Sequence, residues 1–166
     1  STTTTYSGVS GVPTTKITLP ANASGLAETK TQTKNLLGQV TTVTDHYGST
    51  LTNTYDASGN ALTVKRTSHD GTVTATTTMT YWYPVGRKKT LSDPDLLTTW
   101  NYAYNALGEQ VSQTSSTTCS KTRFDGQGRP WLKSDFFNTT CAGTPDASAS
   151  WAYDAAQYGV GQLKEA

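Results

Sequence analysis

The sequence predicts an all-β fold of stacked antiparallel β-hairpin repeats. Three observations lead to this prediction: the composition, a recurring turn motif and the alternation of residues between the turns. Thr is the commonest residue and 10% of the chain is aromatic, and both residue types pack well on a pleated surface. Charged residues make up only 15% of the 166 residues, below the roughly 25% of typical soluble domains. This balance favours strands over helices.

The turn motif consists of an aromatic residue, an Asp or Asn, two variable residues and a Gly. Its aromatic positions recur at intervals of 20 to 29 residues. A polar residue and then apolar residues follow the Gly. The copies are Tyr55-Asp56-Ala57-Ser58-Gly59, Tyr104-Asn105-Ala106-Leu107-Gly108 and Phe124-Asp125-Gly126-Gln127-Gly128, a shorter Tyr83-Pro84-Val85-Gly86, and a degenerate Tyr153-Asp154 followed by Gly159 and Gly161.

This spacing has a local physical explanation. An Asp or Asn side chain at the start of a turn accepts a hydrogen bond from the backbone two residues ahead. A Gly at the end of the turn adopts positive φ, which closes a hairpin loop of three to five residues with a bulge. We expect the aromatic residue at the strand end to pack across onto the apolar residue that follows the Gly.

A second set of turn signals falls between the main ones, so that each repeat contains two strands. These signals are Asp45-His46-Tyr47-Gly48, His69-Asp70-Gly71 and Asp93-Pro94-Asp95, while Gly38-Gln39-Val40 repeats only the second half of the main motif. Strand alternation is visible between the turns, for example in the segment that places Trp100, Tyr102 and Tyr104 on one face.

A single hairpin of this kind is not stable alone. A buried Tyr or Trp contributes at most about 4–6 kcal/mol, whereas ordering a unit of about twenty residues costs roughly 30 kcal/mol. Each hairpin must therefore be stabilised by its neighbours, as the units of a solenoid are. We expect residues 35–166 to form one continuous array, part of a longer protein. Residues 1–34 are expected to form a Thr-rich strand or linker segment in which residues 14–19 are a candidate strand.

The repeated motifs resemble the RHS/YD-repeat family over about residues 35–166. The resemblance implies a long β-sheet that spirals into a hollow shell. In bacterial RHS proteins and toxin-complex shell subunits the shell encloses a toxic C-terminal domain, and in teneurins a similar barrel serves adhesion at the cell surface. The self-cleaving core region of the family has no recognisable counterpart here, because Asp93-Pro94 is typical of an ordinary turn.

The sequence does not favour catalysis. Each of the two histidines, His46 and His69, lies inside a turn signal, and no Gly-x-Ser-x-Gly elbow is present. We therefore predict a protein that is not an enzyme and has no cofactor or metal site. The net charge of +1 is scattered along the chain, which does not favour nucleic acid as a partner. No apolar run is long enough to span a bilayer.

Two cysteines, Cys119 and Cys141, stand 22 positions apart and match no zinc-binding spacing. Paired in an oxidising compartment, they would stabilise the fold by about 3 kcal/mol. The alternative is two separate small residues in a sheet.

The four tryptophans also allow two interpretations. They form the core of the sheet, or some of them form a platform for stacking sugar rings, for which Trp82 and Trp131 are the candidates. The leading functional prediction is a structural β-repeat scaffold, forming a shell, wall or filament of a secreted or cell-surface protein. The alternative is a carbohydrate-binding or cell-adhesion module. Open sheet edges predict pairing with a second copy or with the rest of the parent chain, and glycans or an enclosed toxin domain are further expected partners.

Overall fold

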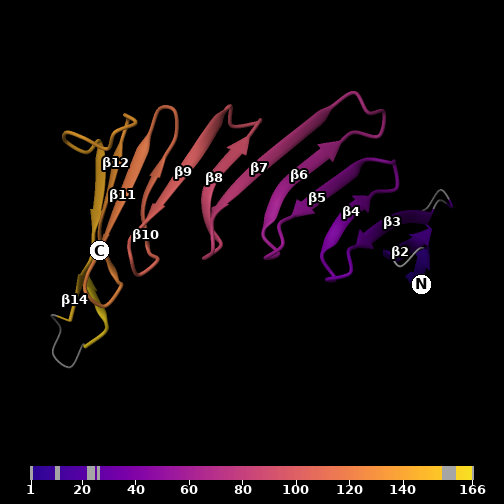
Figure 1. Cartoon of the computed structure of the whole chain (residues 1–166), viewed down its shortest axis with the longest axis horizontal. Helices are drawn as coiled ribbons and strands as arrows, with labels where there is room; N and C mark the ends of the chain where they lie inside the picture. The colour runs from indigo at the N-terminus through magenta and orange to yellow at the C-terminus, as the bar shows by residue number, and fades with distance from the viewer. Residues whose placement is uncertain (1, 10–11, 22–24, 26, 155–159, 166) are drawn as a thin grey trace. The chain divides into compact units, whose positions relative to one another are not determined.

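The computed structural model describes residues 2–9, 12–21, 25, 27–154 and 160–165. Within these residues thirteen strands form one antiparallel sheet in chain order, and two further strands pair with each other (Figure 1). The prediction of stacked antiparallel hairpins is confirmed. The strands are β1 Thr3–Val9, β2 Val12–Ala21, β3 Ala27–Lys34, β4 Val40–Thr44, β5 Thr50–Tyr55, β6 Ala61–Thr67, β7 Thr74–Trp82, β8 Arg87–Asp93, β9 Thr98–Tyr104, β10 Gln110–Thr114, β11 Cys119–Phe124, β12 Pro130–Phe136, β13 Ala147–Ser150, β14 Ala152–Tyr153 and β15 Leu163–Glu165.

The strands belong to two compact units. The first contains Ser1–Met79 with Asp93–Asp95, and the second contains Thr80–Ser92 with Leu96–Ala166. No helix among the described residues has the length and apolar character needed to cross a membrane.

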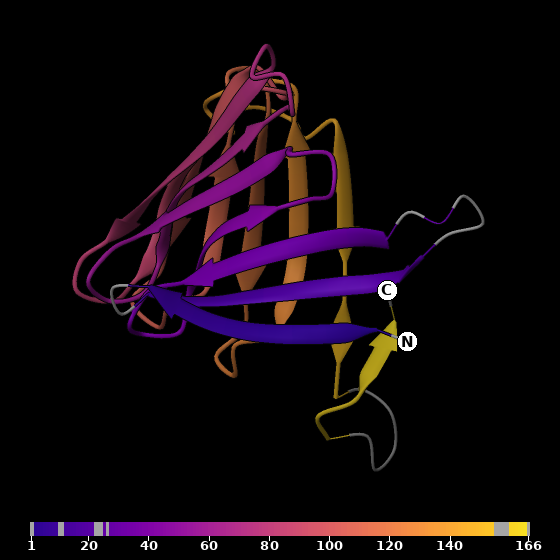
Figure 2. The ribbon, with the colours of Figure 1, turned by 90° about the vertical axis from the view of Figure 1, so that its right-hand side faces the viewer.

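The N-terminal segment contributes full strands to the first unit. β1 pairs with β2 from Thr3 opposite Thr18 to Val9 opposite Val12, and the three strands β1 to β3 lie side by side at the indigo end of the ribbon (Figure 2). The candidate strand at residues 14–19 lies inside β2. Hydrogen bonding continues across the expected boundary at residue 34, because β3 pairs with β4.

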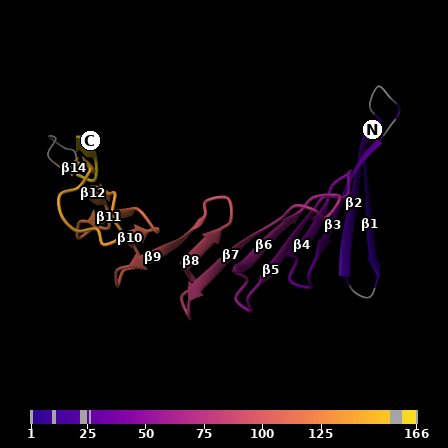
Figure 3. The same ribbon diagram turned by 90° about the horizontal axis from the view of Figure 1, so that it is seen from above.

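Strand alternation organises the second unit, in which β9 to β12 lie side by side (Figures 1 and 3). Along β9 half-buried and exposed residues alternate strictly, and Trp100, Tyr102 and Tyr104 are the half-buried aromatic residues. They share one face of the sheet, as predicted. Burial raises the pKa of the Tyr102 hydroxyl, with a further contribution from Tyr104.

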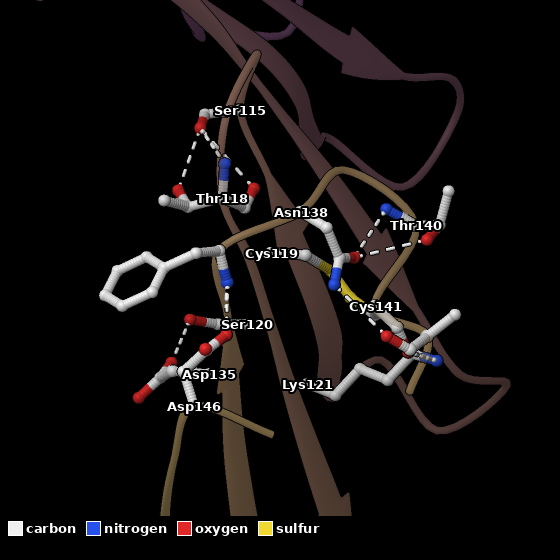
Figure 4. The surroundings of a disulfide bond; sticks show 12 residues. Ser115, Thr118, Cys119, Ser120, Lys121, Asp135, Asn138, Thr140, Cys141 and Asp146 are labelled. Carbon is white, nitrogen blue, oxygen red and sulfur yellow. Dashed lines mark hydrogen bonds between the residues drawn. A yellow bond between two sulfur atoms is a disulfide. The ribbon is translucent and has the colours of Figure 1, made fainter. Parts of the chain in front are cut away.

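The hydrophobic core is small. Among the described residues the buried hydrophobic side chains are Cys119, Phe136 and Cys141, with exposed fractions of 1%, 6% and 7%. A disulfide joins Cys119 of β11 to Cys141 in the loop after β12, and the two Cα atoms are 5.3 Å apart (Figure 4). Of the two interpretations that the sequence left open, the structure therefore has the paired one.

Hydrogen bonds hold the disulfide-bearing loop against the sheet. The Asn138 side chain accepts a hydrogen bond from the Thr140 backbone N–H at 3.1 Å and donates one to the Ala142 carbonyl at 3.1 Å. The Lys121 ammonium on β11 donates to the Cys141 carbonyl at 3.1 Å (Figure 4). The loop is thus tied to β11 by one covalent bond and one charged hydrogen bond.

Candidate functional site: a ladder of linked turns

Four turns at the same end of their hairpins share one backbone hydrogen-bond plan. The N–H of the first residue donates to the carbonyl four residues ahead at 2.9–3.0 Å, and the N–H of the Gly donates back to the first carbonyl at 3.0–3.1 Å. A β-bulge accompanies each turn at the strand ends. The first residues of these turns are Asn35, Asp56, Asn105 and Asp125.

The side chain of the first residue satisfies two more backbone groups. Asp56 Oδ1 accepts from the Ser58 N–H at 2.9 Å, which is the bond expected from the sequence, and also from the Asn60 N–H at 2.8 Å. The other three turns repeat both bonds at 2.9–3.1 Å. One side-chain oxygen therefore caps two donors that the strand ladder does not reach.

The side chain of the residue after the Gly forms a hydrogen bond with the side chain of the first residue. A donor at one of the two positions is matched by an acceptor at the other. Where the turn begins with Asp, this residue donates: Asn60 Nδ2 to Asp56 Oδ2 at 2.9 Å, and Arg129 Nε to Asp125 Oδ2 at 2.8 Å. The Asn60 side chain lowers the pKa of Asp56. The pKa of Asp125 is lowered by the Arg129 backbone N–H and then by its side chain.

Where the turn begins with Asn, the residue after the Gly accepts. Asn35 Nδ2 donates to Gln39 Oε1 at 2.6 Å, and Asn105 Nδ2 donates to Glu109 Oε2 at 2.5 Å. From the sequence, these positions were predicted only to be polar. The signal was nevertheless present, since Asp is followed by a donor and Asn by an acceptor four residues later.

The same side chains reach the next turn at that end of the sheet. In the first unit Gln39 Nε2 donates to the Gly59 carbonyl at 3.1 Å. In the second unit Glu109 lies against Gly128 so closely that a Cβ there would stand 2.6 Å from Glu109 Oε1. The Arg87 guanidinium lies against Gly108 in the same way. A Cβ at position 108 is therefore disfavoured for two reasons. It would collide with the Arg87 guanidinium, and the backbone φ of 93° strains any residue other than glycine.

The last link of this ladder is an ion pair. Arg129 donates to both carboxylate oxygens of Asp154, at 2.9 and 2.5 Å, and its guanidinium lies 4.4 Å from the centre of the Tyr153 ring. The Arg129 side chain, followed by the Gly161 N–H, lowers the pKa of Asp154 to about 2. The Asp154 carboxylate in turn raises the pKa of Arg129. Of the two glycines expected in this degenerate copy, Gly161 has positive φ, and Gly159 lies outside the described residues.

Two of the motif tyrosines, Tyr55 and Tyr153, bind the preceding hairpin. Tyr55 donates its hydroxyl to the Val40 carbonyl at 2.7 Å, and Tyr153 donates to the Pro130 carbonyl at 2.8 Å. Both carbonyls belong to the second residue after the Gly of the preceding turn at this end. The register also places each ring opposite the apolar residue expected within its own hairpin, Tyr55 opposite Ala61 and Tyr153 opposite Leu163. The hydroxyls add a connection between consecutive repeats. Phe124 stands at the corresponding position with no hydroxyl to donate.

Tyr83 corrects one sequence expectation. It is 91% exposed and lies inside its turn, not at a strand end. β7 ends at Trp82, whose carbonyl accepts from the Gly86 N–H at 3.0 Å. The physical reason is Pro84, which has no N–H and so does not continue a strand ladder. The half-buried aromatic residue that precedes the turn is Tyr81.

At the opposite ends of the strands, the Asp45 turn repeats the backbone plan: the Asp45 N–H donates to the Ser49 carbonyl at 3.0 Å, and the Gly48 N–H donates to the Asp45 carbonyl at 3.2 Å. Asp45 Oδ1 accepts from the Ser49 N–H at 2.8 Å, and the Asp93 side chain accepts from the Asp95 N–H at 2.9 Å. The Ser68 and Thr72 hydroxyls lower the pKa of Asp70 to about 2. The part of the chain that the structure describes has no group of three or more His, Cys, Asp or Glu side chains placed to hold a metal ion.

The two sugar-stacking candidates are partly exposed. Trp82 has an exposed fraction of 47% and lies 4.5 Å from the Lys89 ammonium, measured to the ring centre. Trp131 is 39% exposed and lies 5.8 Å from the Arg123 guanidinium. Each of these tryptophans lines a surface groove of the second unit.

Comparisons with known proteins support the fold. No protein-family model matches the sequence, and no curated protein matches it. Among solved structures, the chain is similar to the crystal structure of TcdB2-TccC3 without its hypervariable C-terminal region, with a TM-score of 0.64 and 13% sequence identity. The match covers 89% of this chain and 8% of that chain, so this chain spans a small part of its length. The likeness supports the all-β fold and nothing beyond the fold.

Gly108→Val tests the double role of this glycine. We expect a loss of more than about 1 kcal/mol of unfolding free energy, because a β-branched residue is strained at this φ and displaces Arg87. Gly126→Val is the matched control, since Gly126 also lies in a turn but has no heavy atom within 4 Å of a Cβ. Equal denaturation midpoints for the two variants would contradict the assignment.

Replacing Asn105 by Asp tests the complementary pairing. N105D places a second carboxylate against Glu109 and removes a donor, and we expect a loss of about 1–2 kcal/mol. Adding E109R rebuilds the Asp–Arg pair seen at Asp125 and should restore most of that loss. The measurement is a double-mutant cycle by chemical denaturation, with E109R alone as the fourth corner. Additive effects would refute the pairing.

The Arg129–Asp154 ion pair predicts a stability that depends on pH. The folded pKa of Asp154, about 2, lies below its ordinary value of 3.8, so protonation favours the unfolded chain. The contribution is complete above about pH 4 and is lost as the pH falls toward 2. D154N should be less stable at neutral pH and should lose less on acidification. Asn also tolerates the left-handed backbone at this position, where φ is 62°.

Thermal unfolding at several pH values between 7 and 2 measures this difference. Asp95→Asn, which removes the same charge from an exposed turn of the first unit, is the control. Parallel pH profiles for the parent protein and D154N would count against the ion pair.

Proposed function

We propose that the chain is a structural β-repeat scaffold, a segment of wall whose hairpins hold one another through their turns. The observation that carries the proposal is the ladder of linked turns. Side chains of one turn bind the next turn through Gln39, Glu109 and Arg129. With only three buried hydrophobic residues among those described, stability comes from contacts between neighbouring repeats, as in other repeat proteins.

A shell is the specific form of wall that we propose. The likeness to TcdB2-TccC3 and the resemblance of the turn motifs to RHS/YD repeats both favour it. On this proposal the chain is one section of a larger enclosure, and a toxin domain of the parent protein is the enclosed partner. The chain spans 8% of the length of the matched chain, which fits a section of a wall.

We also propose that the protein works outside the cytoplasm, as a secreted or cell-surface protein. Disulfides persist mainly in oxidising compartments, and the Cys119–Cys141 bridge provides two of the three members of the buried core. Catalysis is not part of the proposal. His46 and His69 lie in exposed turns, which is the environment of a solvated side chain.

The edges of the sheet are the proposed contact surfaces. β1 and β13 are the outermost strands of the sheet formed by the described residues, and unpaired strand edges bind further strands. In the parent protein these partners are neighbouring hairpins, and in the isolated chain they are a second copy. A head-to-tail contact of this kind leads to filaments.

Tyr6→Lys tests edge pairing. Tyr6 lies on β1 and is 81% exposed, and a lysine on an edge strand disfavours pairing with another strand. We expect the parent protein to assemble as its concentration rises from micromolar to millimolar in sedimentation velocity, and Tyr6→Lys to weaken that assembly. Thr76→Lys adds the same charge to an exposed position of the central strand β7 and should have no effect. A protein that stays monomeric throughout would contradict edge-to-edge assembly.

A further inference from the structure

Two neighbouring turns of the second unit expose large side chains at their tips. Tyr83 and Val85 of the β7–β8 turn are 91% and 60% exposed, and Leu107 of the β9–β10 turn is 75% exposed. Both turns lie at the lower ends of their strands in Figure 1, and the Arg87 guanidinium, which lies against Gly108, connects them. Turn positions favour Gly, Pro, Asn, Asp and Ser, so aromatic and aliphatic side chains at two adjacent tips indicate a surface that makes contacts.

Three consecutive cations follow the first of these tips. Arg87, Lys88 and Lys89 begin β8, and no acidic residue stands between Asp70 and Asp93 in the sequence. None of the three cations forms an ion pair with another of the described residues. This short segment therefore concentrates positive charge in a chain whose net charge is only +1, and that charge is available to an external anion.

Trp82 lies at the base of the same tip. It is the last residue of β7 and is exposed, and its ring centre lies 4.5 Å from the Lys89 ammonium. An indole ring has an apolar body and one polar N–H group, and such side chains gather where an apolar layer meets water. Trp82 thus joins the apolar tip to the charged strand behind it.

The order of these groups along the hairpin matches the layers of a lipid interface. The tip is apolar, its base carries an indole ring, and the cations begin one residue after Gly86. At about 3.3 Å per residue, the three cations lie about 3–10 Å behind the turn. Interfacial segments bury their apolar side chains by about 5–10 Å. A tip at that depth would place the cations of β8 among the lipid headgroups.

We propose that these two turn tips dock the protein onto an anionic lipid surface. The exposed side chains of the tips would enter the boundary of the acyl chains, and the cations of β8 would attract anionic headgroups. Docking of this kind needs no spanning segment. It goes beyond the scaffold function and does not depend on it. An acidic peptide offers the same charges without an apolar layer beneath them, and it is the competing ligand in the test.

The test uses the full chain and vesicles of two compositions: phosphatidylcholine alone, and phosphatidylcholine with phosphatidylserine in a seven-to-three mixture. Co-sedimentation measures binding, and quenching of tryptophan fluorescence by lipids with brominated acyl chains reports insertion. We expect at least tenfold tighter binding to the anionic vesicles, with an affinity that falls as salt is added. Equal affinity for the two vesicles would refute the proposal. Binding of a glutamate decapeptide by a protein that leaves both vesicles unbound would overturn the choice of ligand.

Tyr83→Ser tests the apolar tip. Because Tyr83 is almost fully exposed, the variant should keep its fold, which thermal unfolding checks, and should bind anionic vesicles at least fivefold more weakly. Tyr47→Ser is the matched control. It makes the same substitution at an exposed position of the Asp45 turn, at the opposite ends of the strands, and should change the affinity less than twofold.

A double variant tests the cations. Lys88→Gln with Lys89→Gln should weaken binding to anionic vesicles roughly twentyfold, since each cation near an anionic surface contributes about fivefold. Arg87 is left in place because it also belongs to the ladder of linked turns. Lys65→Gln with Arg66→Gln removes two consecutive exposed cations from β6 and should weaken binding less than threefold. Full binding by the Tyr83 variant or by the lysine variant would refute the proposal.

Discussion

The structure depends on side-chain links between successive turns, because the sheet has almost no interior. Most residues of the described strands are half-buried or exposed, and among the described residues only Cys119, Phe136 and Cys141 form a buried cluster. Apolar burial, which usually dominates folding, is therefore small here. Backbone pairing between strands supplies the continuity of the sheet. Backbone pairing is the same for any pair of residues, whereas the contacts of the turn side chains depend on which residue stands at each position. These contacts therefore fix the register from one hairpin to the next.

This arrangement explains why the five residues of each turn make so many side-chain hydrogen bonds. The first residue of each turn accepts from two backbone N–H groups and bonds to the residue after the Gly. In three of the four turns that residue, Gln39, Glu109 or Arg129, also reaches the following turn. Glu109 is the clearest case, since one carboxylate oxygen accepts from Asn105 and the other lies against Gly128. A substitution at one such position therefore removes contacts in two turns. Arg129 extends the same principle to a charge pair, where the Asp154 carboxylate is held ionised by two hydrogen bonds from one guanidinium.

The sequence predicted the type of fold and most of the turns, because Asx and Gly act locally and their effects can be read without tertiary contacts. It did not predict the full turn at Asn35, since no aromatic residue precedes it and only its second half was recognised. Tyr83 was misplaced because the motif was aligned on its ring, although Pro84 determines where β7 ends. The links between turns were not predicted, because they join residues about twenty positions apart and require knowledge of which turns are neighbours. The disulfide remained one of two alternatives for the same reason.

A sheet whose hairpins are held at their turns leaves its faces available for other contacts. Two arginines of the second unit lie over aromatic rings: Arg129 lies 4.4 Å from the centre of the Tyr153 ring and forms ion pairs with Asp125 and Asp154, and Arg123 lies 5.8 Å from the centre of the Trp131 ring with no ion pair among the described residues.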